Sequence, residues 1–223
     1  MFGSADPELS LHPRLAPSLK FIAIPPSLHS LSEARLTFVK IMLSMTKIGM
    51  QSREQERQAR YNMLLSWSAS FEELVSSHDL PSNDAELRAI ALLRFHQSYY
   101  DLILRQPIAL VMKEPLLFDQ YTTEFQEILG HGAVALGLGE SDLESTQHDR
   151  PAQDRWRFHI DIGVTPTLFA IAFLCRDAVV RKIVTELLRH ANLQEGMWNS
   201  HSASQIAEQL AENTAAPTVD EAK

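Results

Sequence analysis

The 223-residue sequence contains one cysteine, Cys175, and only eight glycines. A single cysteine cannot form an internal disulfide, and it excludes structural zinc sites that depend on several cysteine ligands. Average usage would give about 16 glycines in a chain of this length, and a scarcity of glycine favours helices over turn-rich β architecture. Because no alternating strand pattern of convincing length is present either, we expect a fold without a disulfide or an extensive sheet.

Positive charge is also scarce, since 20 Lys and Arg residues stand against 28 Asp and Glu residues and give a formal net charge of -8. An acidic chain repels nucleic acid unless its basic residues are locally concentrated. The densest basic stretch, Arg53–Arg60, is interleaved with Glu54 and Glu56, a pattern typical of a solvated helix face. We therefore expect no direct binding to nucleic acid.

Long hydrophobic runs are missing as well. The longest nearly apolar run, residues 164–175, is interrupted by two threonines and a proline, and spanning a bilayer takes about 20 apolar residues. The amino terminus lacks the apolar segment of a secretory signal. We expect a protein that is neither membrane-spanning nor secreted.

Five of the eleven prolines lie within the first 26 residues, where they disfavour helix. The sequence therefore predicts an extended, proline-rich arm over residues 1–29 and a helical domain over 30–212. Within that domain the polar, non-periodic stretch 139–156 is predicted to be an exposed loop. Residues 213–223 offer too little apolar surface to offset the entropy of ordering, and they are predicted to form a disordered tail.

Between the arm and the tail, apolar residues recur at spacings of three and four, the period of a helix with one buried face. Helix starts are marked by capping pairs, Ser30 with Glu33 and Asn83 with Glu86. The pattern predicts an all-α fold of about seven helices that stack as antiparallel hairpins.

The carboxy-terminal helices begin with a segment that is apolar on every side. Thr165 and Pro166 are predicted to be the cap and first turn of a helix that runs through Leu174. Asp177 is predicted to cap the next helix and Asn192 to end it. In that second helix the pattern places Arg181, Lys182 and Arg189 on the face that meets water.

No glycine-rich phosphate loop, nucleophile elbow or zinc-protease histidine pair occurs in the sequence. His159 and Asp161 would project from the same side of an extended segment, but no neighbouring residue supplies the third ligand that a metal site requires. We therefore expect no metal site and no cofactor, and we interpret this pair as ordinary hydrogen-bonding groups.

The most amphipathic stretch, residues 87–103, carries His96 beside Tyr99, Tyr100 and Asp101. A histidine that faces an apolar cavity could orient a ligand or transfer a proton, because its pKa lies near neutrality. On that interpretation His96, Tyr99 and Asp101 would be catalytic, and the protein would be a small-molecule binder or an enzyme. A core histidine held by hydrogen bonds is the more common case, and Cys175 is likewise expected to be a buried structural thiol.

The stretch FLCRDAVVRKIVTELLRHANLQEGMWNS, residues 173–200, joins an apolar helix to a Cys-Arg-Asp step, an amphipathic helix and a Glu-Gly-x-Trp turn. With GVTPTLFAIA before it, this stretch resembles the carboxy-terminal helical region of fungal binuclear zinc-cluster transcription factors. The segments SLSEARLTFVKIML, WSASFEELV and LRAIALLRFHQSYYDLIL resemble that family's upstream helices more loosely, so the resemblance spans residues 28–212. The residues of the resembling motif, for which a structural role is expected, are Asp161, Pro166, Cys175, Arg176, Asp177, Arg181, Glu195, Gly196 and Trp198.

The family's DNA-binding zinc cluster needs several cysteines in a short basic segment, and this chain has one cysteine in total. The resemblance therefore implies the middle and effector region without the DNA-binding domain, and it supplies no catalytic residue. It implies a regulator of a fungal secondary metabolic pathway that acts through protein contacts, with a zinc-cluster regulator as one possible partner. A homodimer and a small-molecule effector are further options. The implied location is the nucleus, with the cytoplasm as the alternative.

One structural hypothesis concerns the motif residues. If the helix after Asp177 folds back on the preceding one, Arg176 and Glu195 would form an ion pair that locks the hairpin, with Trp198 packed beneath it. Removing one partner of such a buried pair typically costs about 3 to 5 kcal/mol.

Overall fold

The computed structural model describes residues 24–45, 53–77, 80–107, 111, 113–114, 116–138, 157–159 and 163–215. Within these ranges it contains seven α-helices, one 3-10 helix and three short strands, which confirms the prediction of an all-α fold without a substantial sheet. In chain order they are α1 (Leu31–Met45), α2 (Arg53–Ser77), α3 (Asp84–Leu104), η2 (Leu117–Tyr121), α5 (Thr122–Leu136), β1 (Arg157–His159), α7 (Thr165–Leu174), α8 (Ala178–Ala191), β2 (Leu193–Glu195), β3 (Trp198–Asn199) and α9 (Ser200–Ala215).

Several helix ends follow from local sequence, as predicted. The backbone N–H of Glu33 donates to Ser30 Oγ at 3.1 Å, and the N–H of Glu86 donates to Asn83 Oδ1 at 3.0 Å. Asn192 adopts the left-handed conformation with φ 46° and ends α8. The two hydrogen bonds satisfy backbone N–H groups at helix starts that have no partner within the helix, and the conformation of Asn192 stops α8 from continuing.

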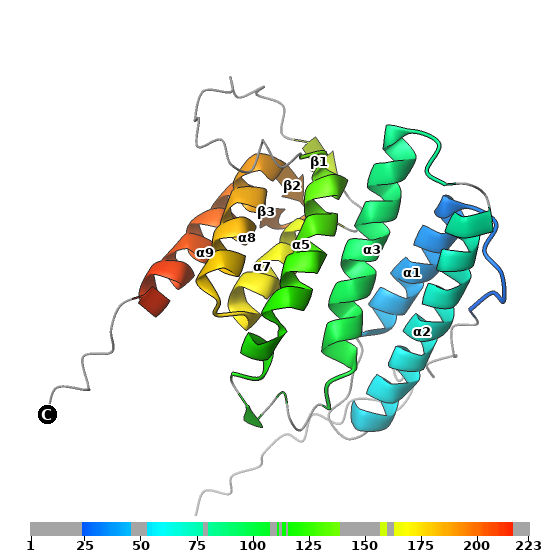
Figure 1. Cartoon of the computed structure of the whole chain (residues 1–223), viewed down its shortest axis with the longest axis horizontal. Helices are drawn as coiled ribbons and strands as arrows, with labels where there is room; N and C mark the ends of the chain where they lie inside the picture. The colour runs from blue at the N-terminus through cyan, green and yellow to red at the C-terminus, as the bar shows by residue number, and fades with distance from the viewer. Residues whose placement is uncertain are drawn as a thin grey trace, which may run out of the picture.

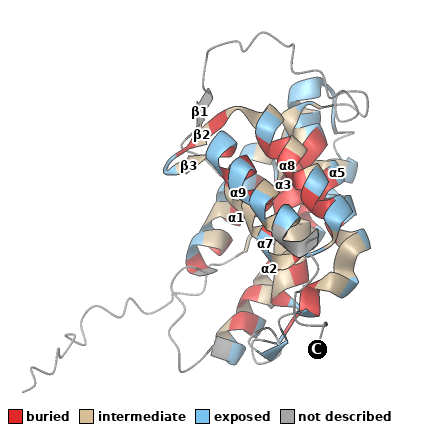
Figure 2. Ribbon diagram, turned by 90° about the vertical axis from the view of Figure 1, so that its left-hand side faces the viewer, coloured by how far each residue is buried: buried red, intermediate tan, exposed pale blue. Residues whose placement is uncertain are grey.

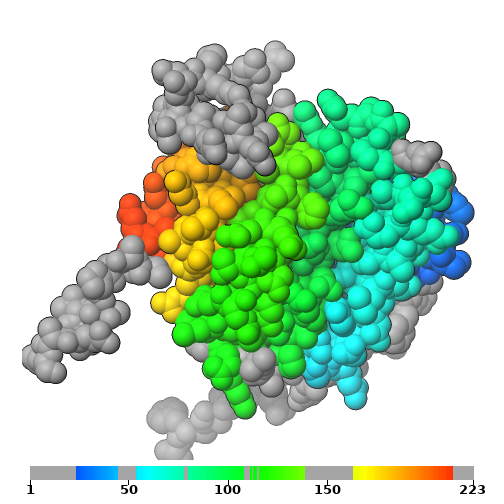
Figure 3. Space-filling model, viewed as in Figure 1, coloured from blue at the N-terminus to red at the C-terminus, as the bar shows by residue number. Residues whose placement is uncertain are grey.

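The helices run up and down beside one another (Figure 1). Helices α2, α3, α5 and α8 follow one another across the face seen in Figure 3, while α1 and α7 lie behind them. Successive helices in this arrangement are antiparallel. Helices α7 and α9, which precede and follow α8 in the chain, therefore run in the same direction. The sequence-based prediction of stacked antiparallel hairpins is consistent with this arrangement.

Two groups of buried apolar side chains share α3 between them. The amino-terminal cluster, formed by α1, α2 and part of α3, is centred on Trp67, whose ring stacks on Phe71 at 4.8 Å and meets Phe38 at 4.7 Å. The carboxy-terminal cluster joins Phe95 of α3 to Phe125 of α5 and to the buried sides of η2, α7, α8 and α9. In Figure 2 buried positions, coloured red, recur along the helices between intermediate and exposed ones.

The basic stretch at the start of α2 does not form a solvated face, so that prediction is wrong for Arg57 and Arg60. Arg60 is only 2% exposed, and its Nε donates to the carbonyl of Ser44 near the end of α1 at 3.1 Å. The guanidinium of Arg57, also buried, donates to the carbonyl of Leu104 at the end of α3. Both arginines therefore supply donors to the last carbonyls of neighbouring helices, which lack partners within their own helix.

A small sheet joins distant parts of the chain. Strand β1 pairs in parallel with β2, and β2 pairs antiparallel with β3 through a turn in which Gly196 has φ 60°. Strands of two or three residues have too few alternating positions to give a sequence signal, which is why the sequence did not predict them.

The predicted domain boundaries are only partly covered by the described residues. Ile24 and Leu28, at the end of the predicted arm, pack against the amino-terminal cluster, and α9 continues to Ala215, past the predicted end of the helical domain at residue 212. The predicted loop 139–156, the rest of the arm and residues 216–223 lie outside the described residues.

Candidate functional site

The motif residues of the carboxy-terminal region gather around helix α7. This ten-residue helix, TPTLFAIAFL, has no charged side chain and packs against α8, α9 and β3. A helix that is apolar on every side cannot stand in water, so its position depends on what its two ends meet. Both ends meet a buried charged side chain.

Glu195 on β2 holds the amino-terminal end of α7. Its carboxylate accepts the backbone N–H of Val164 at 3.1 Å and that of Thr165 at 2.8 Å. The side chain is buried, and it places negative charge where the helix dipole is positive. A side chain at Gly163 would overlap the Glu195 carboxylate, so this approach requires glycine.

This end of α7 differs from the prediction. The capping residue is Val164 rather than Thr165, and Thr165 Oγ1 is buried without a hydrogen-bond partner in the described structure. Glu195, which follows 30 residues later in the chain, performs the capping that the sequence assigned to Thr165. A local pattern cannot identify a cap that comes from a distant strand.

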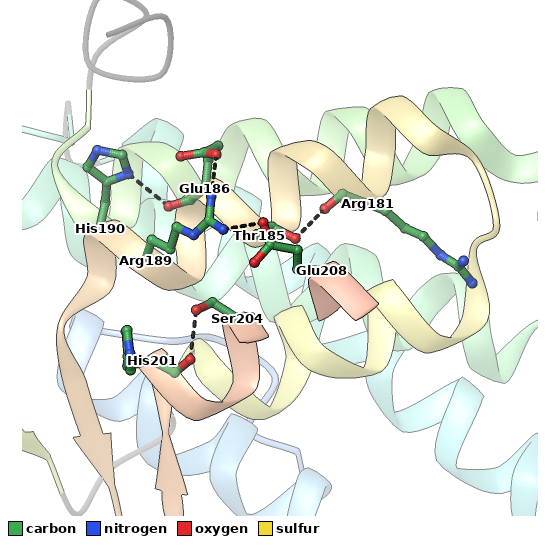
Figure 4. Close-up of polar contacts among 8 residues, drawn as sticks. All are labelled: Arg181, Thr185, Glu186, Arg189, His190, His201, Ser204 and Glu208. Carbon is green, nitrogen blue, oxygen red and sulfur yellow. Dashed lines mark hydrogen bonds and ion pairs between the residues drawn. The ribbon is translucent and has the colours of Figure 1, made fainter. Parts of the chain in front are cut away.

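Arg181 on α8 holds the carboxy-terminal end of α7. Its Nε donates to the carbonyls of Ala172 at 3.1 Å and Cys175 at 2.9 Å, and its Nη1 donates to the carbonyl of Leu210 on α9 at 2.6 Å. In Figure 4 its side chain reaches along α8 toward the segment that joins α7 to α8. The prediction that Arg181 lies on the wet face of α8 is therefore wrong, because this buried cation donates to the carboxy-terminal end of α7 and to a backbone carbonyl of α9.

The proposed ion pair between Arg176 and Glu195 is not formed. Glu195 lies at the start of α7 and Arg176 just beyond its end, and a helix of ten residues is about 15 Å long. The backbone N–H of Arg176 instead donates to Asp119 Oδ1 at 3.1 Å. Trp198 lies against Phe169 of α7, with ring centroids 5.5 Å apart, and not beneath an ion pair.

Other motif residues shape the chain around α7. Asp177 Oδ1 accepts the N–H groups of Val179 and Val180, each at 2.9 Å, and caps α8 as predicted. Cys175 is a buried free thiol, and burial raises its pKa. Pro166 lies in the first turn of α7. Asp161 lies outside the described residues, so its role stays a prediction.

A surface network joins α8 to α9 (Figure 4). The Arg189 guanidinium donates to Glu186 Oε1 of its own helix at 3.0 Å and to Glu208 Oε1 of α9 at 2.6 Å. The bond to Glu208 raises the pKa of Arg189. These contacts identify the side of α9 that faces α8.

His96, the principal residue of the alternative site, lies in the core where α1, α3 and α7 meet. It is 1% exposed, its ring centroid lies 5.0 Å from that of Phe95 and 6.3 Å from that of Phe38, and its Nδ1 lies 3.3 Å from Thr167 Oγ1. Burial lowers the pKa of His96 to about 3. Its Nε2 has no hydrogen-bond partner in the described structure.

Of the other two candidate catalytic residues, Tyr99 follows His96 by one helical turn, whereas Asp101 lies on a different side of α3. Asp101 lies half-exposed 3.9 Å from Arg105, and its negative charge adds to burial in raising the pKa of Tyr61. It follows His96 by five positions, which places it about 140° away around the helix. Tyr99 packs edge-on against Tyr100 at 5.2 Å, and burial raises the pKa of both phenols.

The described residues also bear on the prediction that the protein has no metal site. Among them no three His, Cys, Asp or Glu side chains gather as a possible ligand set. His159 belongs to β1, whereas its proposed companion Asp161 lies beyond the described part of the chain. In the same described portion, no helix is both long and apolar enough to cross a membrane.

Comparison with known proteins gives one informative similarity. Over 80 residues the chain is 37% identical to the aspercryptin biosynthesis cluster-specific transcription regulator of Emericella nidulans. The match covers 32% of this chain and only 12% of the length of that regulator. No family model matches the chain, and no solved structure shows significant similarity to it. Part of the chain is therefore similar to a fungal regulator of transcription, in agreement with the resemblance identified from the motif residues.

Proposed function

We propose that this chain takes part in the regulation of transcription through contacts with other proteins and does not bind DNA by itself. The observation that carries the regulatory role is the similarity to the cluster-specific regulator of Emericella nidulans. The proposed setting is the nucleus of a fungus and the control of a secondary metabolic pathway. A zinc-cluster regulator of the same pathway is the proposed partner, because such a protein would supply the DNA-binding domain.

The charge distribution supports the lack of autonomous DNA binding. The chain carries a net charge of -8, and proteins that hold DNA depend on Lys and Arg side chains that neutralise phosphates. Three arginines, Arg57, Arg60 and Arg181, are buried and donate to backbone carbonyls, so they are not available to a phosphate backbone.

The geometry does not favour the enzymatic alternative. At neutral pH a histidine with a pKa near 3 is a weak base, because general bases work best when their pKa lies close to the operating pH. Asp101, which could have assisted it, is turned toward Tyr61 and Arg105. We therefore assign His96 to the core.

Deletion of the gene tests the regulatory role. We expect a coordinated loss of transcripts from the genes of one biosynthetic cluster, measured by RNA sequencing, together with loss of the product. An unchanged transcript profile with accumulation of a pathway intermediate would instead indicate an enzyme and contradict the proposal.

A gel-shift assay tests the mode of action. The purified chain alone should leave promoter DNA unshifted at physiological salt, and it should retard further the complex between that DNA and a zinc-cluster regulator from the same gene cluster. Sequence-specific binding by the chain alone, or a complex whose mobility the chain leaves unchanged, would refute the proposed mode.

A further inference from the structure

Helix α1 carries apolar side chains on its outer side as well as on the side that meets the core. Ala34, Phe38 and Ile41 are completely buried, and α1 packs mainly against α2 and α3. Leu36 is 62% exposed and Leu43 is 59% exposed. These two leucines are seven positions apart, which places them within about 20° of one another around the helix and about 10 Å apart along it. The outer side of α1 therefore presents an apolar stripe that the described part of the chain leaves exposed.

Basic residues border this stripe on both sides. Arg35 and Lys40, both exposed, are the basic residues of α1. Measured from Leu36, Lys40 lies about 40° around the helix in one direction and Arg35 about 100° in the other, so Leu43 and the half-buried Val39 lie between them. Apolar positions three and four residues apart, flanked by charged positions, are the pattern of a coiled-coil seam.

The acidic residues nearest to the stripe in the structure make other contacts. Glu33, the one acidic residue of α1, accepts the backbone N–H of His29 at 2.9 Å. Three of the four carboxylates of α2 form ion pairs within α2 or with α3, namely Glu54 with Arg57, Glu56 with Arg60 and Glu72 with Arg94. The fourth, Glu73, follows Trp67, which bonds to α1 near its start. The borders of the stripe are therefore locally basic, on a chain whose net charge is -8.

We propose that this surface, the α1 stripe, docks an amphipathic helix of a partner protein whose own apolar seam is bordered by Glu or Asp. The α1 stripe consists of Leu36, Val39 and Leu43 with Arg35 and Lys40 at its borders. Two apolar seams exclude water where they meet, and opposite charges beside the seams select the partner and fix its register.

The charges distinguish this occupant from a second copy of the stripe. Both charged residues of the stripe are basic, so a contact between two stripes brings basic residues against basic residues in either orientation of the two helices. A partner helix bordered by carboxylates meets the opposite charge on both sides. The inference rests on the proposed function, since it names the surface and the partner chemistry of the protein contacts through which the chain acts.

The test uses two synthetic peptides of three heptads, both with Leu at the a and d positions. One carries Glu at e and g, and the other carries Lys there. Fluorescence anisotropy measures the binding of each labelled peptide to the purified full chain. On net charge alone the acidic chain favours the Lys peptide, but the α1 stripe should favour the Glu peptide at least about tenfold in Kd at low salt, and this preference should shrink as salt is added.

Variants locate the binding. Lys40→Glu should weaken binding of the Glu peptide at least about tenfold and strengthen that of the Lys peptide, while Leu43→Gln should weaken both. The matched controls are Lys182→Glu on α8, which lies apart from α1 in Figure 1, and Leu116→Gln, whose side chain is 54% exposed. Both controls should bind like the unaltered chain, and circular dichroism checks that every variant folds.

Three results would overturn the proposal: no binding of the Glu peptide, equal binding of the two peptides, or a preference that Lys40→Glu leaves unchanged. Self-association of the chain that Leu43→Gln abolishes would also overturn it, because the occupant would then be a second copy. The gel-shift assay separates this outcome from failure of the proposed function. If Lys40→Glu retards the complex of a zinc-cluster regulator with DNA as fully as the unaltered chain does, the docking surface is wrong and the function stands. If the chain binds the Glu peptide as expected but retards no such complex, the function is wrong and the peptide-binding surface stands.

Discussion

The two halves of the molecule satisfy the backbone groups at their helix ends in different ways. In the amino-terminal half, Arg57 and Arg60 come from the first turns of α2 and each reaches the end of one neighbouring helix, with Glu54 and Glu56 of the same helix beside them. In the carboxy-terminal half, Arg181 on α8 donates to the end of α7 and to a carbonyl of α9, and the buried Glu195 carboxylate from β2 accepts from the start of α7.

This difference shows what a wholly apolar helix requires. Helices α1 and α2 each have a wet face and a buried face, so packing of one stripe positions them. Helix α7 has no such asymmetry, and a charged group at each end fixes it in place while its outer side remains exposed at Phe173. The amino-terminal half therefore depends mainly on aromatic packing. In the carboxy-terminal half two buried charged side chains, Glu195 and Arg181, hold α7 in place, and Phe173 on its outer side stays exposed.

Substitution of Trp67 should have the largest effect, because it tests the aromatic packing directly. Trp67→Ala removes the stack on Phe71, the contact with Phe38 and the hydrogen bond from Nε1 to the carbonyl of Ala34 at 2.9 Å. We expect a loss of about 3 to 5 kcal/mol in the free energy of unfolding, measured by urea denaturation. The control Trp198→Ala removes a half-buried ring and should cost less than about 2 kcal/mol. Equal costs would show that the Trp198 ring contributes to the core as much as the Trp67 ring does.

The buried arginines provide the next comparison. Arg181→Met removes the donor to two carbonyls at the end of α7 and to one carbonyl of α9, and it should cost about 3 kcal/mol. Arg60→Met removes one bond to a helix-end carbonyl, that of Ser44 on α1, and the ion pair with Glu56 of its own helix, and it should cost about 1.5 kcal/mol. Both values come from the same denaturation measurement. A cost for Arg60→Met as large as that for Arg181→Met would contradict the stronger dependence of the carboxy-terminal half on its buried cation.

Glycine substitutions test the amino-terminal end of α7. Gly163→Ala would displace the Glu195 carboxylate from the helix start, and we expect a loss of about 2 kcal/mol in thermal or urea unfolding. Gly130 is the control, since it lies within α5 and a Cβ there meets no atom within 4 Å. Gly130→Ala should stabilise the protein by up to about 1 kcal/mol. If Gly163→Ala were equally harmless, the carboxylate would not be needed for the position of α7.

The last effect concerns His96, which lies where the two halves meet, and it is absent at neutral pH. Its pKa is lowered to about 3 in the folded chain from an ordinary value of 6.5, so between these values the unfolded chain binds a proton that the folded chain does not. The stability is therefore fully present above about pH 6.5 and falls by about 1.4 kcal/mol per pH unit as the pH decreases toward 3.

The difference between the unaltered chain and His96→Leu isolates this contribution from that of the other titrating groups. In urea titrations at several pH values, the difference in unfolding free energy should change with pH in favour of the variant as the solution becomes more acidic. A difference that is constant from pH 7 to pH 4 would show that His96 is not buried as described.

The sequence contained signals for some of the misjudged residues. Arg57 and Arg60 continue the spacing of Leu64, Trp67 and Phe71, all of which are buried along α2. This periodicity indicated burial, but the interleaved glutamates suggested a solvated face. The choice between them depended on whether another helix ended nearby, and that is information only the packed structure contains.

The prediction for Arg181 failed for the same reason. It adjoins Val180 and precedes Val184 by three positions, so it lies beside the apolar stripe of α8. A charged residue at the border of a stripe can turn toward water or toward the interior. The carbonyls of Ala172 at the end of α7 and of Leu210 in α9 decided the outcome, and their position could not be read from α8 alone.

The amino-acid sequence by itself determined the helices, the caps at Ser30, Asn83 and Asp177, and the absence of an extensive sheet from the described part of the chain, because these depend on interactions between residues a few positions apart. Only the tertiary structure decided which charged side chains are buried, that Glu195 rather than Thr165 begins α7, and that Arg176 and Glu195 lie apart. The physical reason is that a helix end can be satisfied by any donor or acceptor that folding brings to it, and the distance along the chain places no limit on where that partner comes from.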